Sequence, residues 1–441
     1  MQQSQIFRAL VSKYRVASIL LFAQLIFLII AMSWREANWA SHVDYANRVF
    51  AMQQITLGNW APRYLIFNWS HLADHADFTI YATAFFYLIN HSIPWIMYLQ
   101  AVFLLVAEIF LIATVEEYFG YRFPENDSGK IAAVLAALYA TNPLILFAVL
   151  DDPHLHMFGM VAGLAVVARG MLRQTLVLVT IGSLLILISG DLASAYVGAA
   201  IIGFLSVRQS RWFPGITVLF ITILFSLTIQ GLLSPVGSNF LLHYGHLGGS
   251  DINSAFSVVK AVLQNPLKAI AYWLRSFQSF FGLIASFGAV GLLVPLGLPL
   301  TILNLGSTGL ALRTSVGRPP NPEWPGSFLA SPWQVLPTLL VGVTGSIVFC
   351  IWLYRRRSAI WRKFSIVLGA GILMNSLYFG FSSFHHIITR GTYPKAMSQS
   401  LNRAASFIPK GAKVYATVGV SGHLSWDHKV FLALPVTNVF R

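Results

Sequence analysis

Long apolar runs alternate with short polar segments along most of this sequence. Runs of about 17–25 apolar residues can cross a bilayer as helices, and they predict about eleven spans here. The expected spans lie near residues 16–33, 93–115, 130–150, 154–168, 174–190, 192–206, 213–233, 272–287, 289–305, 335–354 and 364–384. Gly288, Pro295 and Pro299 favour a tight hairpin between the eighth and ninth spans.

The longest polar interruption in the first half of the chain runs from Trp34 to His91. It contains Asp44, Asp74 and Asp77 together with several histidines. We expect a large loop between the first two spans, over residues 34–92.

A second polar stretch follows the last span. In it, SQSLNRAASFI is typical of a helix, and PKGAKVYATV of a turn followed by a strand. The expected organisation is a membrane domain over residues 1–384 and a small extracytoplasmic segment over residues 385–441.

Composition places the chain in the membrane class. Its 441 residues are 56% hydrophobic and 10% charged, with a mean hydropathy of +0.68. A soluble domain has about 25% charged residues, so the expected fold is an all-α polytopic membrane protein. Cys350, the single cysteine, lies inside an apolar run, which excludes an internal disulfide framework.

The net charge of +14 is best explained by topology, because many basic residues lie in short loops between spans. The strongest signal is RRRSAIWRK at residues 355–363. The positive-inside rule predicts a cytoplasmic N-terminus, an uncleaved signal anchor as first span and an extracytoplasmic C-terminus. Nucleic acid is not an expected partner.

The same orientation places all 12 histidines and most acidic residues on the outer side. Longer outer loops would collect polar residues in any case. That account does not cover the very short turns around residues 151–156 and at Asp191. We therefore expect one polar site at the outer membrane edge.

Asp44 follows the first span closely and has Arg48 four residues later, a spacing that allows an ion pair on a helix. It is a candidate general base, and the alternative is a surface cap or ion pair. His71 and His75 have a spacing that can bind a metal. However, Leu72 occupies the position at which the zinc-protease motif has glutamate, so a divalent cation is possible but not expected.

Two further segments contain candidate ligands. DDPHLHMFG offers Asp151, Asp152, His154 and His156 for a cation or a sugar hydroxyl. HYGHLGGS is expected to be a Gly-rich loop whose backbone can approach an anion. Lys260, Lys268 and Arg275 follow this loop and can pair with a phosphate. The alternative for SAFSVVKAVLQNPLKAI is an amphipathic helix at the membrane surface.

Several segments together resemble one group of proteins. The matching segments are HADFTIYATAFFYLI, DDPHLHMFG, SGDLASAYVGA, HYGHLGGS, LLVPLGLPLTILNLGS and IPKGAKVYATVGVSGHLS, in that order over most of the chain. They resemble the GT-C superfamily of membrane glycosyltransferases, and more closely an uncharacterised group of predicted membrane proteins related to that superfamily.

The resemblance implies transfer of a sugar from a polyprenyl-phosphate carrier to an acceptor at the outer face, with inversion at C1. It implies Asp44 as the base, and the residues themselves offer Asp152 as a second candidate. The residues expected to bind substrate are His75, Asp77, Asp151, His154, His156, Asp191, His243, Tyr244, His246, Lys268 and Arg275. Two features depart from the family pattern: Tyr45 follows Asp44, and Gly190 precedes Asp191.

Two alternatives remain at this stage. A lipid or small-molecule transporter would show ionisable groups deeper in the membrane, whereas only Glu108 is expected there. A structural subunit would use its aromatic residues, including 12 Trp and 33 Phe, against lipid or membrane-protein partners.

Overall fold

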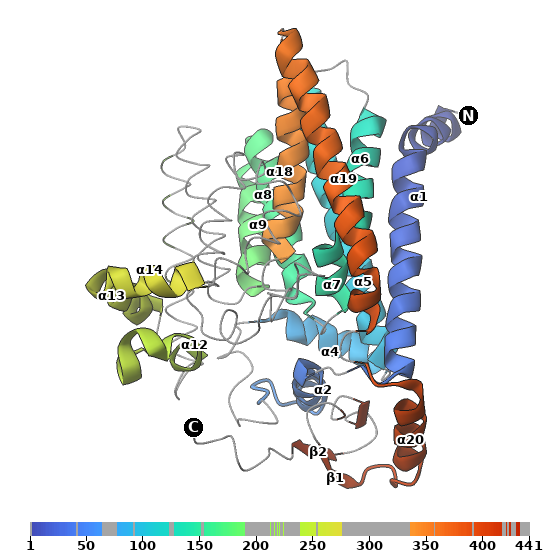
Figure 1. Ribbon diagram of the computed structural model, residues 1–441, viewed down its shortest axis with the longest axis vertical. Coiled ribbons are helices and arrows are strands. Elements are labelled where there is room, and N and C mark those ends of the chain that lie inside the picture. Colours follow the sequence, from blue (N-terminus) through green and yellow to red (C-terminus); the bar gives the residue numbers. More distant parts are fainter. Residues whose placement is uncertain are drawn as a thin grey trace.

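The computed structural model is a bundle of long helices with several shorter helices at one end (Figure 1). It describes residues 2–40, 43–63, 77–90, 93–122, 128–150, 154–189, 239–252, 255–275, 336–356, 358–389, 392–416, 420, 423–424 and 429–432, with 212, 216, 218, 220 and 224 singly.

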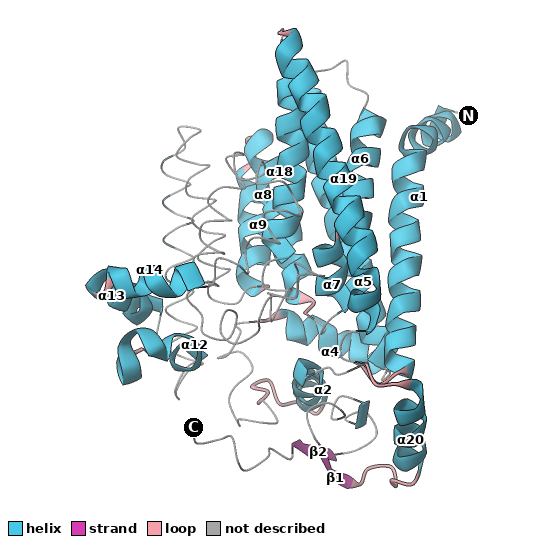
Figure 2. Ribbon diagram, viewed as in Figure 1, coloured by secondary structure: helices cyan, strands magenta, loops and turns pink. Residues whose placement is uncertain are grey.

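The described elements are almost all helical (Figure 2). They are α1 (Gln2–Ala37), α2 (Val43–Thr56), α4 (Thr79–Ile89), α5 (Ile93–Arg122), α6 (Ser128–Thr141), α7 (Pro143–Leu150), α8 (His156–Leu172), α9 (Leu176–Ile188), α12 (Asn239–Gly248), η1 (Gly249–Asp251), α13 (Ala255–Gln264), α14 (Pro266–Arg275), α18 (Leu336–Tyr354), α19 (Ala359–Thr389), α20 (Lys395–Ser406), β1 (Lys413–Ala416) and β2 (Lys429–Leu432).

Two described helices are long and apolar enough to cross a membrane by themselves, Lys13–Ala37 and Trp95–Gly120. Their mean hydropathies are 2.5 and 2.3, and they coincide with the expected spans at 16–33 and 93–115. Shorter apolar helices include α8, α9 and most of α18. The expected spans at 192–206, 213–233, 272–287 and 289–305, with their hairpin, lie wholly or largely outside the described residues.

The expected span at 130–150 consists of two helices with a bend between them. Gly129–Thr141 and Pro143–Leu150 meet at 58°. At the break, the Asn142 side-chain oxygen accepts hydrogen bonds from the backbone N–H of Leu144 and Ile145, at 3.0 and 3.2 Å. Asn142 thus caps the second helix, and Pro143 fits its first position because no N–H is needed there.

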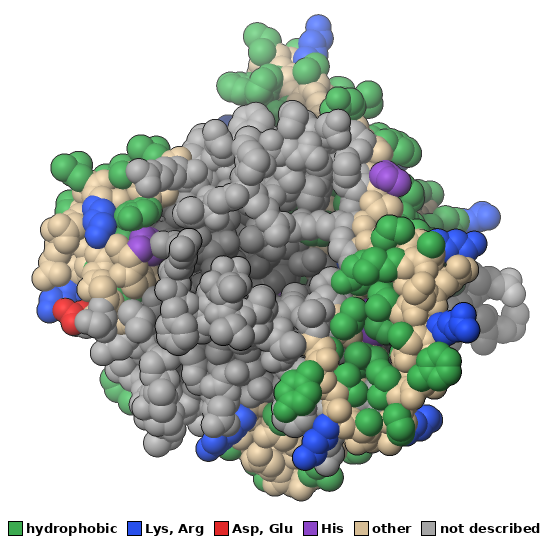
Figure 3. Space-filling model, turned by 60° about the horizontal axis from the view of Figure 1, so that its bottom comes forward, with side chains coloured by type: hydrophobic (Ala, Val, Ile, Leu, Met, Phe, Trp, Pro, Cys, Tyr) green, Lys and Arg blue, Asp and Glu red, His purple; other side chains and the backbone are tan. Residues whose placement is uncertain are grey.

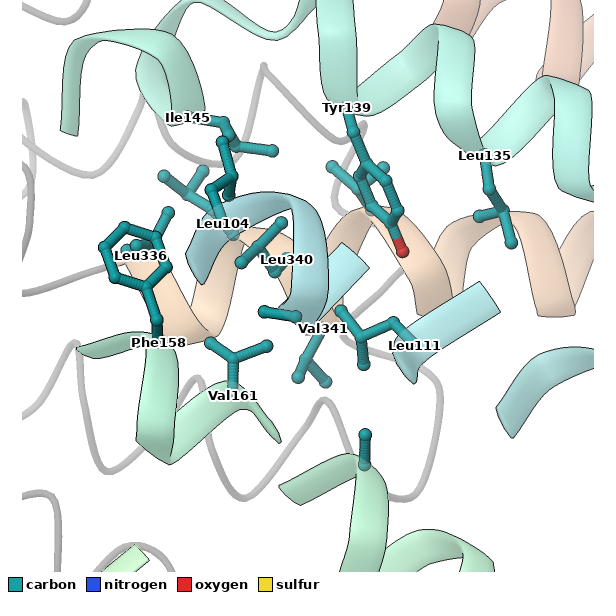
Figure 4. Close-up of a cluster of buried hydrophobic side chains, with 14 of the residues drawn as sticks. Leu104, Leu111, Leu135, Tyr139, Ile145, Phe158, Val161, Leu336, Leu340 and Val341 are labelled. Atoms are coloured by element: carbon teal, nitrogen blue, oxygen red, sulfur yellow. The ribbon is translucent and has the colours of Figure 1, made fainter. Parts of the chain in front are cut away.

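The main core lies where α5, α6, α7, α8 and α18 meet (Figure 4). Leucine and valine side chains fill this region around the buried Tyr139 ring, whose hydroxyl hydrogen-bonds Thr344 Oγ1 at 2.5 Å. The bond gives a buried polar group the partner it requires.

Helices α8 and α9 cross with their backbones in close approach. A Cβ atom added at Gly163 would lie 2.8 Å from the Gly182 carbonyl oxygen, and one added at Gly182 would lie 2.7 Å from the Gly163 carbonyl oxygen. Small residues at a helix crossing permit this approach, as in membrane helix pairs.

The two ends of the bundle differ in charge and structure. At one end, Glu117 of α5 pairs with Arg169 and Arg173 near the end of α8, and Arg355 and Arg356 follow α18. At the other end lie α2, α4, α12, α20 and the two strands (Figure 1).

The C-terminal segment contains the expected helix and strand, as α20 and β1. Strand β1 pairs with β2 in parallel, with Lys413 opposite Lys429. The segment packs against the end of α1: the Trp39 indole N–H donates to Asn402 Oδ1 at 2.7 Å, and its ring stacks on His423 at 4.7 Å.

Candidate functional site

A buried polar cluster joins α2 and the start of α4 to α8. Asp77 precedes α4 and is 0% exposed. Its Oδ2 accepts from the Arg48 guanidinium of α2 at 3.0 Å, and its Oδ1 accepts from the Thr79 backbone N–H at 3.0 Å and from the Thr79 hydroxyl. The carboxylate therefore holds α2 and the first turn of α4 together.

His156, at the first position of α8, completes this cluster. It is 0% exposed, and its Nδ1 lies 3.2 Å from Arg48 Nη2 and 3.4 Å from Asp77 Oδ2. A guanidinium donates hydrogen bonds and accepts none. Nδ1 therefore accepts from Arg48 in the tautomer with the ring proton on Nε2, and it faces Asp77 Oδ2 as a donor in the other tautomer.

His154 extends the cluster towards α5. Its ring lies 5.7 Å from the ring of His156, edge to face, and its backbone N–H donates to the Gln100 side chain. Gln100 in turn donates to the Val149 carbonyl at 2.7 Å. A side chain from α5 thus contacts both the end of α7 and the residue two positions before α8.

Apolar residues that neighbour these charged residues in the sequence form a buried cluster. Residues of α2 and α4 pack with Ile96, Leu99 and Leu155 into a small core of their own. Ionised groups with few water contacts interact more strongly than exposed ones, so Asp77 and Arg48 form a stiff connection.

Asp44, the expected base, lies in the first turn of α2, four residues before Arg48. At about 1.5 Å per residue, that is about 6 Å along the helix axis. Its side chain is outside the part that the structure describes, as is the expected pair with Arg48.

A second cluster forms on α12 and α14. The sequence predicted a Gly-rich loop here, and this prediction was wrong for most of the segment: Asn239–Gly248 is helical and is followed by one 3-10 turn. Apolar contacts of Leu247 with Ile252 and Ala261 stabilise the helix. Of the local glycines, Gly249 has a positive φ, of 68°.

The same cluster contains three of the expected ligands. The His246 ring packs edge to face against Tyr272 at 4.5 Å, in a small core that also includes Tyr244. Lys268 donates to the Leu247 carbonyl at 3.4 Å. The single amphipathic helix of the alternative prediction is two helices, which meet at Pro266.

The expected site residues that the structure describes fall into two groups. Asp77, His154 and His156 form one group, and Tyr244, His246 and Lys268 form the other. The two groups lie at the same end of the molecule but apart from each other (Figure 1). His75, Asp151, Asp152 and Asp191 are outside the described residues, as are the side chains of His243 and Arg275.

The surface at this end has few exposed acidic side chains within its described part (Figure 3). Hydrophobic side chains gather there, with Lys and Arg around them. Within the described ranges, there is no group of three or more His, Cys, Asp or Glu residues that could bind a metal ion.

Sequence reasoning did not include Arg48, Thr79 or Gln100 among the functional residues. Arg48 was predicted only as an ion-pair partner of Asp44. Its position in a stretch with many histidines and aspartates was the signal that could have indicated a functional role. Nothing local indicates Gln100, which reaches residues about fifty positions away along the chain.

The arrangement of helices is that of a polytopic membrane protein with a GT-C fold. It is similar to the crystal structure of ArnT from Cupriavidus metallidurans bound to undecaprenyl phosphate, with a TM-score of 0.50 and 11% identity, over 93% of this chain and 85% of that chain. No curated protein matches the sequence.

Residues 21–434 match the model of a family described as predicted membrane protein, DUF2079. The chain belongs to this family. Both parts of the resemblance inferred from the sequence, to GT-C enzymes and to a related group of predicted membrane proteins, are thereby confirmed.

Proposed function

We propose that this protein transfers a sugar from a polyprenyl phosphate to an acceptor hydroxyl at the extracytoplasmic membrane face. The supporting observation is the GT-C fold, shared over most of the chain with a protein crystallised with undecaprenyl phosphate. In a sugar linked to a lipid phosphate, the lipid phosphate is the leaving group, and it departs without the help of a strong acid. The enzyme has to supply a base for the acceptor and positive charge for the phosphate.

Asp44 is the proposed base. It takes the proton of the acceptor hydroxyl, whose oxygen attacks C1 of the sugar as the lipid phosphate leaves from the opposite face. Asp77, Arg48 and His156 are positioning residues in this proposal. They fix α2 to α4 and α8, so that Asp44 keeps its place one turn away. Asp152 is the alternative base.

The lipid phosphate is proposed to lie near α12 and α14. Lys268 and His246 are there, and His243 and Arg275 belong to the same helices. Large apolar side chains of α13 and α14 are exposed, including Leu263 and Leu267, at 75% and 81%. An exposed apolar face beside lysine suits the boundary between acyl chains and headgroups.

We further propose that the N-terminus is cytoplasmic. The arginines after α18 and at the end of α8 lie at the opposite end of the bundle from α2 and α4. Basic residues concentrate on the cytoplasmic side, which puts the candidate site on the outer side.

Lipid binding tests the first part of the proposal. Undecaprenyl phosphate is expected to raise the unfolding temperature of the purified protein, while undecaprenol, which lacks the phosphate, is not. Ligand at about 100 times its dissociation constant stabilises by about 2.7 kcal/mol. Equal effects of the two lipids would contradict a phosphate site.

Activity tests the second part. Asp44→Asn is expected to lower sugar transfer from a labelled polyprenyl-phosphate sugar by about 10²–10⁴-fold, the usual contribution of a general base. Glu117→Gln, at the other end of the bundle, is the control and should retain transfer. If Asp44→Asn transfers sugar at the wild-type rate, Asp44 is not the base. If the wild-type protein neither binds the lipid nor transfers sugar, the result favours the alternative that the protein is a structural subunit.

A further inference from the structure

One buried carboxyl group belongs to neither group of candidate site residues. Glu108 belongs to α5 and is 0% exposed. Gln24 of α1, 5% exposed, donates from Nε2 to Glu108 Oε1 at 3.0 Å. Both residues lie near the middle of the apolar helices Lys13–Ala37 and Trp95–Gly120.

Two oxygen atoms of this pair have no hydrogen-bond partner among the described residues. They are Gln24 Oε1 and Glu108 Oε2, and both are acceptors if the carboxyl is ionised. Each buried polar atom without a partner costs about 1–3 kcal/mol. A charged carboxylate would cost more, because no described lysine, arginine or histidine forms an ion pair with Glu108.

We propose that Glu108 is a proton-binding site within the membrane and is a neutral carboxylic acid in the folded protein. Its Oε2–H then donates to Gln24 Oε1 while Gln24 Nε2–H donates to Glu108 Oε1. A single proton supplies a partner to both atoms and removes the charge. The pair becomes a ring of two hydrogen bonds that joins α1 to α5.

The rest of α5 provides an internal comparison. Glu117, nine positions further along, has ion pairs with Arg169 and Arg173 and lies at the end of the bundle. Two guanidinium groups satisfy its charge, so it is an ordinary carboxylate. The two residues share one helix and differ in their partners, which makes Glu117 the matched control.

Infrared spectroscopy of the full-length protein in lipid at neutral pH tests the proposal. A neutral carboxylic acid has a C=O stretching band that a carboxylate lacks. We expect this band to be present in the wild type, lost in Glu108→Gln and retained in Glu117→Gln. A wild-type minus Glu108→Gln difference spectrum that shows carboxylate bands and no carboxylic-acid band would overturn the proposal.

Stability gives a second readout that does not depend on spectral assignment. Glu108→Gln should keep the wild-type unfolding midpoint, because a glutamine offers Gln24 the same donor and acceptor without a proton. Glu108→Leu should lower it, because both polar groups of Gln24 then lose their partner. A Glu108→Gln variant as unstable as Glu108→Leu would contradict the ring. Neither experiment depends on the proposed sugar transfer.

Discussion

The most informative perturbation removes the charge of Asp77 and keeps its shape. In Asp77→Asn the side-chain oxygen can still accept from the Thr79 backbone N–H, so the connection to α4 remains. The amide group that replaces Oδ2 is a donor and faces the Arg48 guanidinium, which is also a donor. The variant therefore leaves a buried arginine without its counter-ion.

The structure sets the expected magnitude. Arg48 and Asp77 have side-chain exposures of 7% and 0%, so water can compensate little of the lost interaction. Removing one member of a buried ion pair costs about 3–5 kcal/mol, a factor of about 10²–10⁴ in the unfolding constant at about 1.4 kcal/mol per tenfold. Glu117→Gln breaks a more exposed pair and should cost about 1 kcal/mol or less.

A double-mutant cycle measures the pair itself. The variants are Asp77→Asn, Arg48→Met and both together, unfolded in mixed micelles under conditions where refolding is reversible. We expect the double variant to be more stable than the sum of the single losses, by about 1–3 kcal/mol, because it leaves no unpaired charge. Additive losses, or an Asp77→Asn variant as mild as Glu117→Gln, would refute the reasoning.

Two further predictions concern packing. Gly163→Ala should destabilise the protein by about 1–3 kcal/mol, since its Cβ meets the Gly182 carbonyl, whereas Gly371→Ala has open space and should not; thermal unfolding compares them, and equal effects would contradict the close crossing. His423→Ala removes the ring stacked on Trp39 and the contact with the Ala40 carbonyl at 2.9 Å. Hydrogen exchange should then accelerate in the C-terminal segment and remain unchanged in α8; unchanged exchange in both would contradict the packing described.

Much of the fold could be predicted from local pattern. The spans at 16–33 and 93–115 appear within α1 and α5, and the helix and strand after residue 390 appear as α20 and β1. The HYGHLGGS segment was misread because its glycines suggest a loop. The segment is helical, and its Leu247 packs against Ile252 and Ala261. A pattern of glycines does not reveal these contacts.

The candidate site was less predictable, because its members are far apart in the sequence. Arg48 meets Asp77 and His156 at separations of 29 and 108 residues. The sequence predicted Asp44 as the partner of Arg48, because the two residues are four positions apart and this spacing allows an ion pair on a helix. A single segment reveals only such spacings.

The sequence by itself determined that this chain belongs in a membrane and where the spans at 16–33 and 93–115 lie. These properties follow from the free energy of transferring apolar residues out of water, which depends on the residues of each segment alone. The tertiary structure decided the bend at Asn142, the crossing of α8 with α9, the Arg48–Asp77–His156 cluster and the Gln24–Glu108 pair. Each of these depends on which helices pack together. A buried polar group needs a partner that lies on another helix, and the close approach of two helices depends on the residues of both.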